Sequence, residues 1–344
     1  MDAKPKQVSL GLAGTGSFAH KAHGPAILGD PGLKLVSVFS RSLSNARTFA
    51  DSCGEQTRSI NITDNFDSLI RARDVEAIDI VLPTQVIGGA IKRALSAGKH
   101  VLSEKPISGS LREAEALIGF WRALEPQPVW LVAENWRFEE SFMEARRQID
   151  AGTIGKPTKV KSDCVTVRPL DSPYVQCEWR KASALHCGWL LDIATHGIAA
   201  LRLIFDDFLL VGDTTLVREE VDGGVSETVS APIRLSNDVQ GNLTFLYEVK
   251  PKIQPVFDVR IEVVGTEGRL LADRNSLRHW DGQGREQKRR EYHCLTVSRC
   301  ISAFVEAIQD RVPVNNDNPL HPERALFDLK ILERIREPLL KRIA

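Results

Sequence analysis

The turn Gly14–Ala19, with the pattern G-x-G-x-x-A, contains the residues whose types and spacing most clearly suit a chemical task. It follows a short apolar run, Val8–Ala13, which predicts a buried strand, and it should open a helix. Gly14 permits a tight turn, Gly16 lets the backbone approach a pyrophosphate, and Ala19 lets helix and strand pack closely. The first N–H groups of such a helix hold phosphates. We therefore expect a bound dinucleotide rather than an ordinary glycine-rich loop, with contacts from Gly14, Thr15, Gly16, Ser17 and Phe18.

The end of the next predicted strand, Leu33–Ser40, bears on which dinucleotide is bound. Proteins that bind NAD normally place Asp or Glu there to hold the ribose hydroxyls. This chain has Ser40-Arg41-Ser42 about 20 residues past the glycines, with no carboxylate. Arg41 could pair with a 2′-phosphate and Ser40 could add a hydrogen bond, whereas the alternative is an arginine that only contacts water. The pattern favours NADP(H) as the cofactor and leaves NAD(H) possible.

Strand-type and helix-type segments alternate through the N-terminal part of the chain. This alternation predicts parallel strands in a doubly wound α/β sheet, with a ligand at their carboxyl ends. We assign residues 1–133 to this dinucleotide-binding Rossmann domain. Further strands are expected near Arg58–Ile60 and at Ala77–Pro83, His100–Ser103 and Val129–Ala133, and helices at Asn45–Cys53, Asn65–Ala72, Gly88–Ala97 and Ser110–Leu124.

Beyond Glu134 the pattern changes to long strands joined by short turns, which predicts antiparallel pairing. Residues 134–344 are therefore expected to form a second, α+β domain on an open antiparallel sheet, which binds substrate and mediates oligomerisation. The expected strands are Thr158–Val167, Glu227–Leu235, Gly241–Glu248, Asp258–Val264 and Arg269–Asp273, followed by helices Val297–Asp310 and Pro322–Arg342. A helix is also expected at Glu140–Ala151 and a loop at Arg168–Gly188, and the terminal helix could pack back on the first domain.

Composition narrows the function classes. The 344 residues include 45 Lys and Arg and 45 Asp and Glu, so overall charge favours neither nucleic acid nor membrane partners. The N-terminal residues lack the apolar core of a secretory signal, and the six cysteines lack metal-ligand or C-x-x-C spacing. We therefore expect a cytoplasmic protein with reduced thiols, no metal, and a small molecule as its substrate.

Two longer stretches carry a resemblance to a known family. AGKHVLSEKP, residues 97–106, and GWLLDIATHGIAALR, residues 188–202, together with the glycine turn, resemble the Gfo/Idh/MocA oxidoreductases over nearly the full length. AENWRF, residues 133–138, is similar to uncharacterised NADP-linked members from fungi and plants. The resemblance implies a Rossmann domain followed by an open antiparallel sheet. It also implies an NAD(P)-dependent dehydrogenase or reductase, commonly a homodimer or homotetramer that associates through the C-terminal sheet.

The family resemblance places the catalytic residues at Lys105, Asp192 and His196. Asp192 and His196 are four residues apart on a predicted helix and therefore share one face. Histidine can accept or donate a proton near neutral pH, and a lysine at the end of a parallel strand can stabilise a negative oxygen. Asp192 could orient the imidazole or bind a substrate hydroxyl. The alternatives are an ordinary helical ion pair and a lysine in solvent.

Other predicted contacts rest on position or on the resemblance. Many relatives have Asn and His soon after the proline that ends the strand here at Pro83, but this chain has Ile87 at the histidine position. Cofactor contacts are still expected from Pro83, Thr84, Gln85, Glu104 and Lys105. Substrate contacts are expected from Arg168, Trp179, Arg180 and Asp192, because aromatic faces suit sugar C–H surfaces and arginine suits hydroxyls or a carboxylate.

These features predict an oxidoreductase that transfers hydride between NADP(H) and a sugar, polyol or other small carbonyl or alcohol. The alternative is a non-catalytic regulatory protein of the same fold that senses a dinucleotide. Three residues distinguish the enzyme from the sensor, because a sensor does not need Lys105, Asp192 and His196 together.

Overall fold

The computed structural model describes residues 7–54, 60–177, 189–236, 238–293, 295–310, 315 and 317–343. The chain divides into two compact units. Unit 1 comprises Met1–Asn135 and Leu295–Phe327, and unit 2 comprises Trp136–Cys294 and Asp328–Ala344. Residues 295–327 are thus grouped with the N-terminal unit, while the domain boundary expected at 133/134 stays a prediction.

Unit 1 contains a six-stranded parallel sheet in the order β3-β2-β1-β4-β5-β6, which confirms the predicted Rossmann fold. The order reverses at β1 and β4, the place where doubly wound sheets bind their ligands. Apolar residues dominate these short strands because helices cover both faces of a parallel sheet. The strands are β1 (Val8–Ala13), β2 (Leu33–Phe39), β3 (Asn61–Thr63), β4 (Ala77–Ile80), β5 (His100–Ser103) and β6 (Trp130–Val132).

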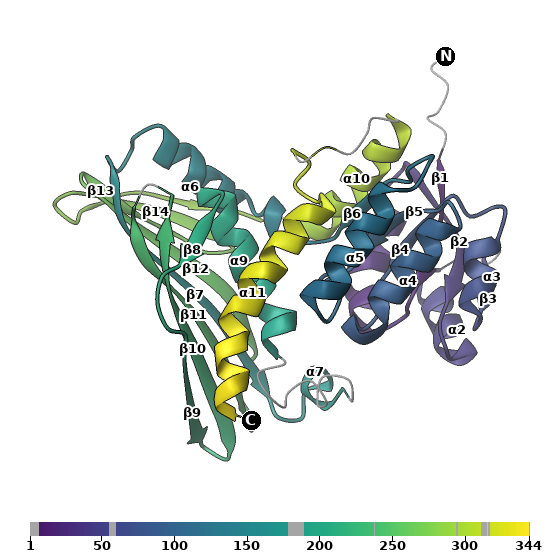
Figure 1. Ribbon diagram of the computed structural model, residues 1–344, viewed down its shortest axis with the longest axis horizontal. Helices are drawn as coiled ribbons and strands as arrows, with labels where there is room; N and C mark the ends of the chain where they lie inside the picture. Colours follow the sequence, from purple (N-terminus) through teal and green to yellow (C-terminus); the bar gives the residue numbers. More distant parts are fainter. Residues whose placement is uncertain are drawn as a thin grey trace. The chain divides into compact units, whose positions relative to one another are not determined.

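Three helices of unit 1, α2, α3 and α5, begin at a side chain that caps them. Ser42, Asn65 and Ser110 each accept a hydrogen bond from a backbone N–H of the first turn, which satisfies one of the free donors there. The α4 and α5 helices pack side by side (Figure 1). The helical segments are η1 (Ala19–His23), α1 (Gly24–Gly29), α2 (Leu43–Ser52), α3 (Phe66–Arg71), α4 (Thr84–Ser96), α5 (Leu111–Arg122) and α10 (Thr296–Gln309).

Three details of unit 1 differ from the sequence-based expectation. The helix after the glycine turn contains a π-helical turn, η1, between the α-helical residues Ser17 and Phe18 and the α-helix that starts at Gly24. Helix α4 begins at Thr84 instead of Gly88, so Ile87 lies inside it, 1% exposed. The third strand starts at Asn61, and residues 58 and 59 of the strand expected near Arg58–Ile60 lie outside the described residues.

Unit 2 contains a nine-stranded sheet in the order β15-β14-β13-β12-β7-β11-β10-β8, with β9 also paired to β10. Most pairs are antiparallel as expected, but β7 and β11 run parallel. Helix α9 and three strands separate β7 from β11 in the sequence, which leaves room for the long crossover that a parallel pair needs. The central strands are β7 (Pro157–Pro169), β10 (Gly224–Leu235), β11 (Gln240–Lys250), β12 (Val256–Gly265) and β13 (Gly268–Ala272).

Four outer strands of this sheet were not predicted. They are β8 (Phe208–Leu210), β9 (Thr215–Val221), β14 (Ser276–Asp281) and β15 (Glu286–Glu291). All six residues of β15 are exposed, and each is charged or amide-bearing, so the sequence lacks the apolar alternation that marks a strand. Charged edge strands of this kind also discourage pairing with other chains.

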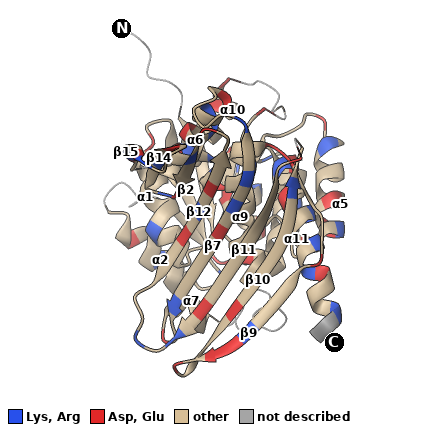
Figure 2. Ribbon diagram, turned by 90° about the vertical axis from the view of Figure 1, so that its left-hand side faces the viewer, with Lys and Arg blue, Asp and Glu red and all other residues tan. Residues whose placement is uncertain are grey.

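Helices α6 (Glu140–Asp150) and α9 (Trp189–Phe205) pack on one face of the unit 2 sheet. Residues that alternate with the buried ones point to the other face, where the described part of the chain places no helix (Figure 2). Both signs of charge are mixed over β12, β7, β11 and β10 on that face, including Lys159, Lys161, Asp163, Asp258 and Arg260.

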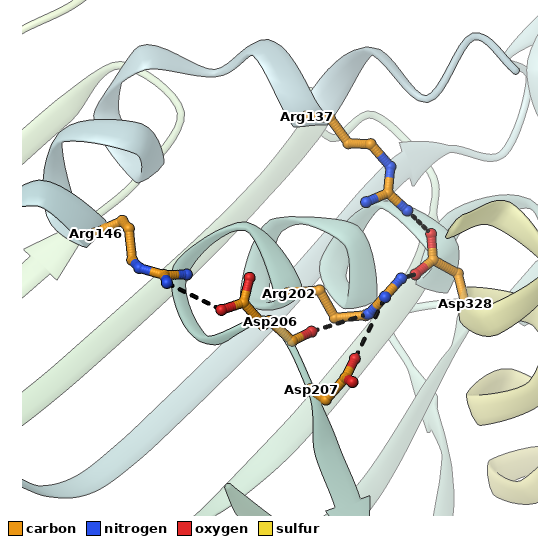
Figure 3. Close-up of polar contacts among 6 residues, drawn as sticks. All are labelled: Arg137, Arg146, Arg202, Asp206, Asp207 and Asp328. Atoms are coloured by element: carbon orange, nitrogen blue, oxygen red, sulfur yellow. Dashed lines mark hydrogen bonds and ion pairs between the residues drawn. The ribbon is translucent and has the colours of Figure 1, made fainter. Parts of the chain in front are cut away.

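Within unit 2, a buried ion network joins Asp328 of the last helix, α11 (Pro322–Ile343), to Arg137 and Arg202 (Figure 3). The two oxygens of Asp328 accept hydrogen bonds from Arg137 and Arg202, the latter at 2.7 Å, and these side chains are 3–8% exposed. The Arg202 guanidinium also donates to the backbone oxygen of Asp206 at 3.0 Å and pairs with Asp207 at 3.4 Å. Removing one member would leave buried charge without its partner, which is costly.

We expect Asp328→Asn to lower the free energy of unfolding by about 1.5–3 kcal/mol, because hydrogen bonds to charged groups are worth that much. Urea denaturation followed by circular dichroism measures the change. The control is Asp150→Asn, whose partner is Arg146 and whose side chain is 61% exposed. An exposed pair contributes roughly 0–1 kcal/mol, so equal losses from the two variants would contradict a stabilising role for the buried network.

No helix among the described residues is long and apolar enough to cross a membrane. Within the same residues, no group of three or more His, Cys, Asp or Glu side chains is arranged to hold a metal ion.

Candidate active site

The glycine turn lies at the carboxyl end of β1. Gly14 has φ +109°, and a Cβ there would lie 2.1 Å from the carbonyl oxygen of Val81, so only glycine fits. A Cβ at Gly16 would meet no atom within 4 Å, which leaves its backbone open to a bound group. Gly16 and Ser17 are exposed, and the Phe18 ring is 45% exposed. The predicted phosphate-binding residues therefore form an accessible turn that fits a dinucleotide.

Ser40 and Arg41 follow β2, next to the glycine turn, whose Gly14 N–H bonds to the Phe39 oxygen at 2.9 Å. Arg41 is exposed and forms no ion pair with any described residue. The hydroxyl of Ser42 accepts from the Asn45 N–H at 3.3 Å and caps α2. Arg41 thus lies at the start of a helix with no ion-pair partner among the described residues, which suits an anion such as a 2′-phosphate.

The remaining cofactor candidates of unit 1 follow β4 and β5, two adjacent parallel strands. Pro83 precedes the first turn of α4, where Thr84 is half-buried and Gln85 exposed. Glu104 is 9% exposed and Lys105 half-buried directly after β5. Because these residues follow strands that pair with each other in parallel, they lie at the same edge of the sheet.

Unit 2 places Asp192 and His196 on α9, as the sequence predicts. His196 is 8% exposed, and its ring packs 5.7 Å from the Trp136 ring and 5.4 Å from the Phe257 ring. Asp192 is half-buried and accepts a hydrogen bond from the Tyr174 hydroxyl. Tyr174 lies on α7 (Pro173–Gln176), which Ser172 caps. The rings of Trp136 and Phe257 thus pack against His196, and the Tyr174 hydroxyl holds the Asp192 carboxylate by a hydrogen bond.

Arg168 lies in the same cluster but not in a loop, contrary to expectation. Strand β7 continues to Pro169 because its ladders with β11 and β12 continue, pairing Arg168 with Val249 and Val167 with Val256. The Arg168 guanidinium lies 4.8 Å from the Tyr174 ring centre and 6.0 Å from that of Phe257. Its buried Nε has no hydrogen-bond partner among the described residues. Trp179 and Arg180, the other two predicted substrate contacts, lie outside the described residues.

Comparison of the sequence with models of known protein families identifies the family of this chain. The model described as "Oxidoreductase family, NAD-binding Rossmann fold" matches residues 8–126, and the model for the GFO/IDH/MocA C-terminal domain matches residues 142–271. The chain belongs to the Gfo/Idh/MocA oxidoreductase family. The predicted family resemblance is therefore confirmed.

Several characterised and solved members of the Gfo/Idh/MocA family are similar to the chain. A dehydrogenase from Fusarium mangiferae is 28% identical over 350 residues, which cover 95% of each chain. An inositol 2-dehydrogenase from Rhizobium meliloti is 26% identical over 88% of this chain and 87% of that one. The crystal structure of a 3-ketoreductase from Actinomadura kijaniata with NADP and TDP-benzene matches 96% of this chain and 98% of that one, with a TM-score of 0.79 and 22% identity.

One cluster near Lys105 was missed by reasoning from the sequence. His23 is fully buried, and its two ring nitrogens lie 2.7 Å from an oxygen of Asp79 and 3.0 Å from one of Glu104. Burial alone would lower the pKa of His23, but the charge of Asp79 and hydrogen bonds to Asp79 and Glu104 raise it to about 10. The available signal was Asp79, a carboxylate in the apolar run AIDIVLP, which needs a buried partner.

Proposed function

We propose that this member of the Gfo/Idh/MocA family is an NADP(H)-dependent oxidoreductase that transfers hydride between nicotinamide and a sugar, polyol or other small carbonyl or alcohol. The observation that carries the proposal is the pair of half-buried Asp192 and buried His196 on one face of α9, within an aromatic cluster. The Rossmann glycine turn and Lys105 in unit 1 supply the features that hydride transfer also requires. A protein that only bound a dinucleotide would not need the α9 residues.

The proposed cofactor contacts come from the ends of four strands, β1, β2, β4 and β5. Gly14 to Phe18 bind the pyrophosphate, and Ser40 with Arg41 bind the 2′-phosphate. Pro83, Thr84, Gln85, Glu104 and Lys105 contact the nicotinamide half. The open space at Gly16 and the unpaired charge of Arg41 among the described residues support this assignment. NADP supplies the hydride acceptor and NADPH the donor.

The proposed chemistry assigns one task to each catalytic side chain. In oxidation, hydride leaves the substrate carbon for the cofactor while His196 accepts the hydroxyl proton, and reduction reverses both transfers. The Lys105 ammonium stabilises negative charge on the substrate oxygen. Asp192, hydrogen-bonded to Tyr174, orients the substrate or the imidazole. Arg168, Trp179 and Arg180 bind substrate hydroxyls or a carboxylate.

The cofactor assignment predicts that NADPH binds more tightly than NADH. Arg41→Ala should lower the affinity for NADPH roughly tenfold to a hundredfold, because that is the contribution of an arginine–phosphate ion pair to binding. NADH affinity should change little, because NADH lacks the 2′-phosphate. Fluorescence titration measures both constants, with Arg47→Ala, also exposed in the same segment, as the control. An unchanged NADPH-to-NADH ratio in the Arg41 variant would contradict the assignment.

The function itself is tested by turnover. The purified chain is mixed with NADPH and a panel of sugar-derived and small carbonyls, and with NADP and a panel of polyols, while absorbance of the reduced nicotinamide is followed. We expect turnover on at least one panel member. Tight NADPH binding without turnover of any compound on either panel would contradict the proposed enzymatic function and favour a dinucleotide sensor.

The proposed assembly is a homodimer or homotetramer that associates through the open face of the unit 2 sheet. Both charge signs occur there, so two copies of the face can pair opposite charges (Figure 2). Light scattering coupled to size-exclusion chromatography measures the mass. A monomer at all concentrations tested would refute the proposal.

A further inference from the structure

The π-helical turn η1 places His23 in the interior of unit 1. The backbone N–H of Gly24 bonds to the oxygen of Ala19, five residues earlier, where an α-helix would use a partner four residues earlier. Such turns occur mostly as single insertions in α-helices, often at functional sites. This one directly follows the glycine turn, and it ends at His23, which is 0% exposed.

Two carboxylates from neighbouring strands face the His23 ring. Asp79 lies within β4 and is 0% exposed, and Glu104 directly follows β5. Nδ1 of His23 is 2.7 Å from Asp79 and Nε2 is 3.0 Å from Glu104. Both ring nitrogens thus face carboxylate oxygens, which a protonated ring serves with two donors, and these contacts outweigh burial and raise the pKa of His23 to about 10. Among the described residues, Asp79 and Glu104 are the charged groups in contact with this ring.

The Glu104 carboxylate also contacts the backbone of Lys105. While one oxygen accepts from His23, the other accepts from the Lys105 N–H at 3.3 Å. The Glu104 N–H donates to the Ile80 oxygen of β4 at 2.9 Å, so backbone and side chain are both held. A continuous chain of hydrogen bonds therefore runs from Asp79 through His23 and Glu104 to the residue that we assign to catalysis.

We propose that His23 is a positioning residue for the reaction: held between Asp79 and Glu104, its cationic ring fixes the Glu104–Lys105 turn and thereby aims Lys105 at the substrate oxygen. The proposal rests on the function proposed above, since it presupposes that Lys105 acts on a substrate. It assigns His23 no contact with substrate or cofactor. A small displacement of a group that must meet the reacting atom can cost about 10²-fold in rate.

The first test compares His23→Gln with His20→Gln. His20 lies on the same turn but is only half-buried and contacts Ser52 and the Phe49 ring instead. On a substrate from the panels, we expect His23→Gln to lower kcat by about 10²-fold while NADPH affinity stays nearly unchanged, and His20→Gln to behave like the natural chain. Equal kcat values for the two variants would overturn the proposal.

The second test uses Asp79→Asn, which keeps the shape and the bond between His23 and Glu104 but removes one of the two charges that hold the proton. The pKa of His23 should then fall below the natural chain's value of about 10, so the variant ring loses its proton at lower pH than the natural ring. The ratio of kcat in the variant to kcat in the natural chain should fall as pH rises. Nitrogen NMR of histidine-labelled protein follows the His23 ring itself. A constant ratio while the variant ring deprotonates, or a neutral His23 in the natural chain near pH 8, would overturn the proposal.

A third measurement needs no substrate. Acetic anhydride is the probe, and the acetylation rate of Lys105 is read by peptide mass spectrometry. If His23 positions Lys105, His23→Gln changes this rate several-fold and His20→Gln does not; identical rates would overturn the proposal. Failure to find any turnover would refute the enzymatic function, whereas unchanged Lys105 reactivity would refute the positioning role alone. If His23→Gln does not fold, as judged by thermal unfolding and NADPH binding, Asp79→Asn replaces it in this assay.

Discussion

Replacing Lys105 by alanine is expected to lower kcat by about 10²–10³, the usual cost of removing one preorganised donor to a developing negative oxygen. Lys105 follows β5 at the carboxyl edge of the parallel sheet, where the nicotinamide of a Rossmann enzyme lies. NADPH affinity should be largely retained, because the glycine turn and Arg41 hold the opposite end of the dinucleotide. Steady-state kinetics and fluorescence titration on the same protein measure the two effects.

Lys34→Ala is the matched control for Lys105→Ala. Lys34 is exposed on β2, and its removal takes away the same charge from the same unit. The control should leave kcat at the natural value. If Lys105→Ala also turned over a verified substrate at the natural rate, the assigned role of Lys105 would be wrong.

Replacing His196 by glutamine is expected to lower kcat by about 10²–10⁴, the contribution of a positioned proton donor or acceptor. Glutamine retains much of the side-chain volume between Trp136 and Phe257, so the loss should come from proton transfer rather than from a cavity. Phe257→Leu is the control, since it disturbs the same packing and leaves the imidazole in place. A larger loss of kcat from Phe257→Leu than from His196→Gln would show that packing, and not proton transfer, explains the effect.

The double variant of Lys105 and His196 tests whether both side chains act on one oxygen. If they do, the combined loss should be smaller than the product of the single losses, because groups that act as a unit are not additive. Asp192→Asn should cost less than either, since an amide keeps a hydrogen-bonding group toward Tyr174. Fully multiplicative losses would indicate two independent functions.

Local patterns determined the N-terminal fold almost completely. The pattern around Gly14 and Gly16 predicted a buried strand before the glycines and a helix after them. The alternation of apolar runs with amphipathic segments predicted the parallel sheet. The position of Lys105 after β5 and the shared face of Asp192 and His196 followed from element boundaries and helical period. These inferences succeeded because they depend on neighbours within about one turn or one strand.

Strand pairings and side-chain contacts between residues distant in the sequence became known only from the tertiary structure. The parallel pairing of β7 with β11, and the charged edge strand β15, follow from where strands meet rather than from their own composition. Tyr174 reaches Asp192 across 18 residues, and His23 reaches Asp79 and Glu104 across 56 and 81. A hydrogen bond between such partners depends on how the fold brings separate helices and strands together, so spacing along the chain could not reveal it. The carboxylates that raise the pKa of His23, against the lowering effect of burial, meet the ring only in the folded unit.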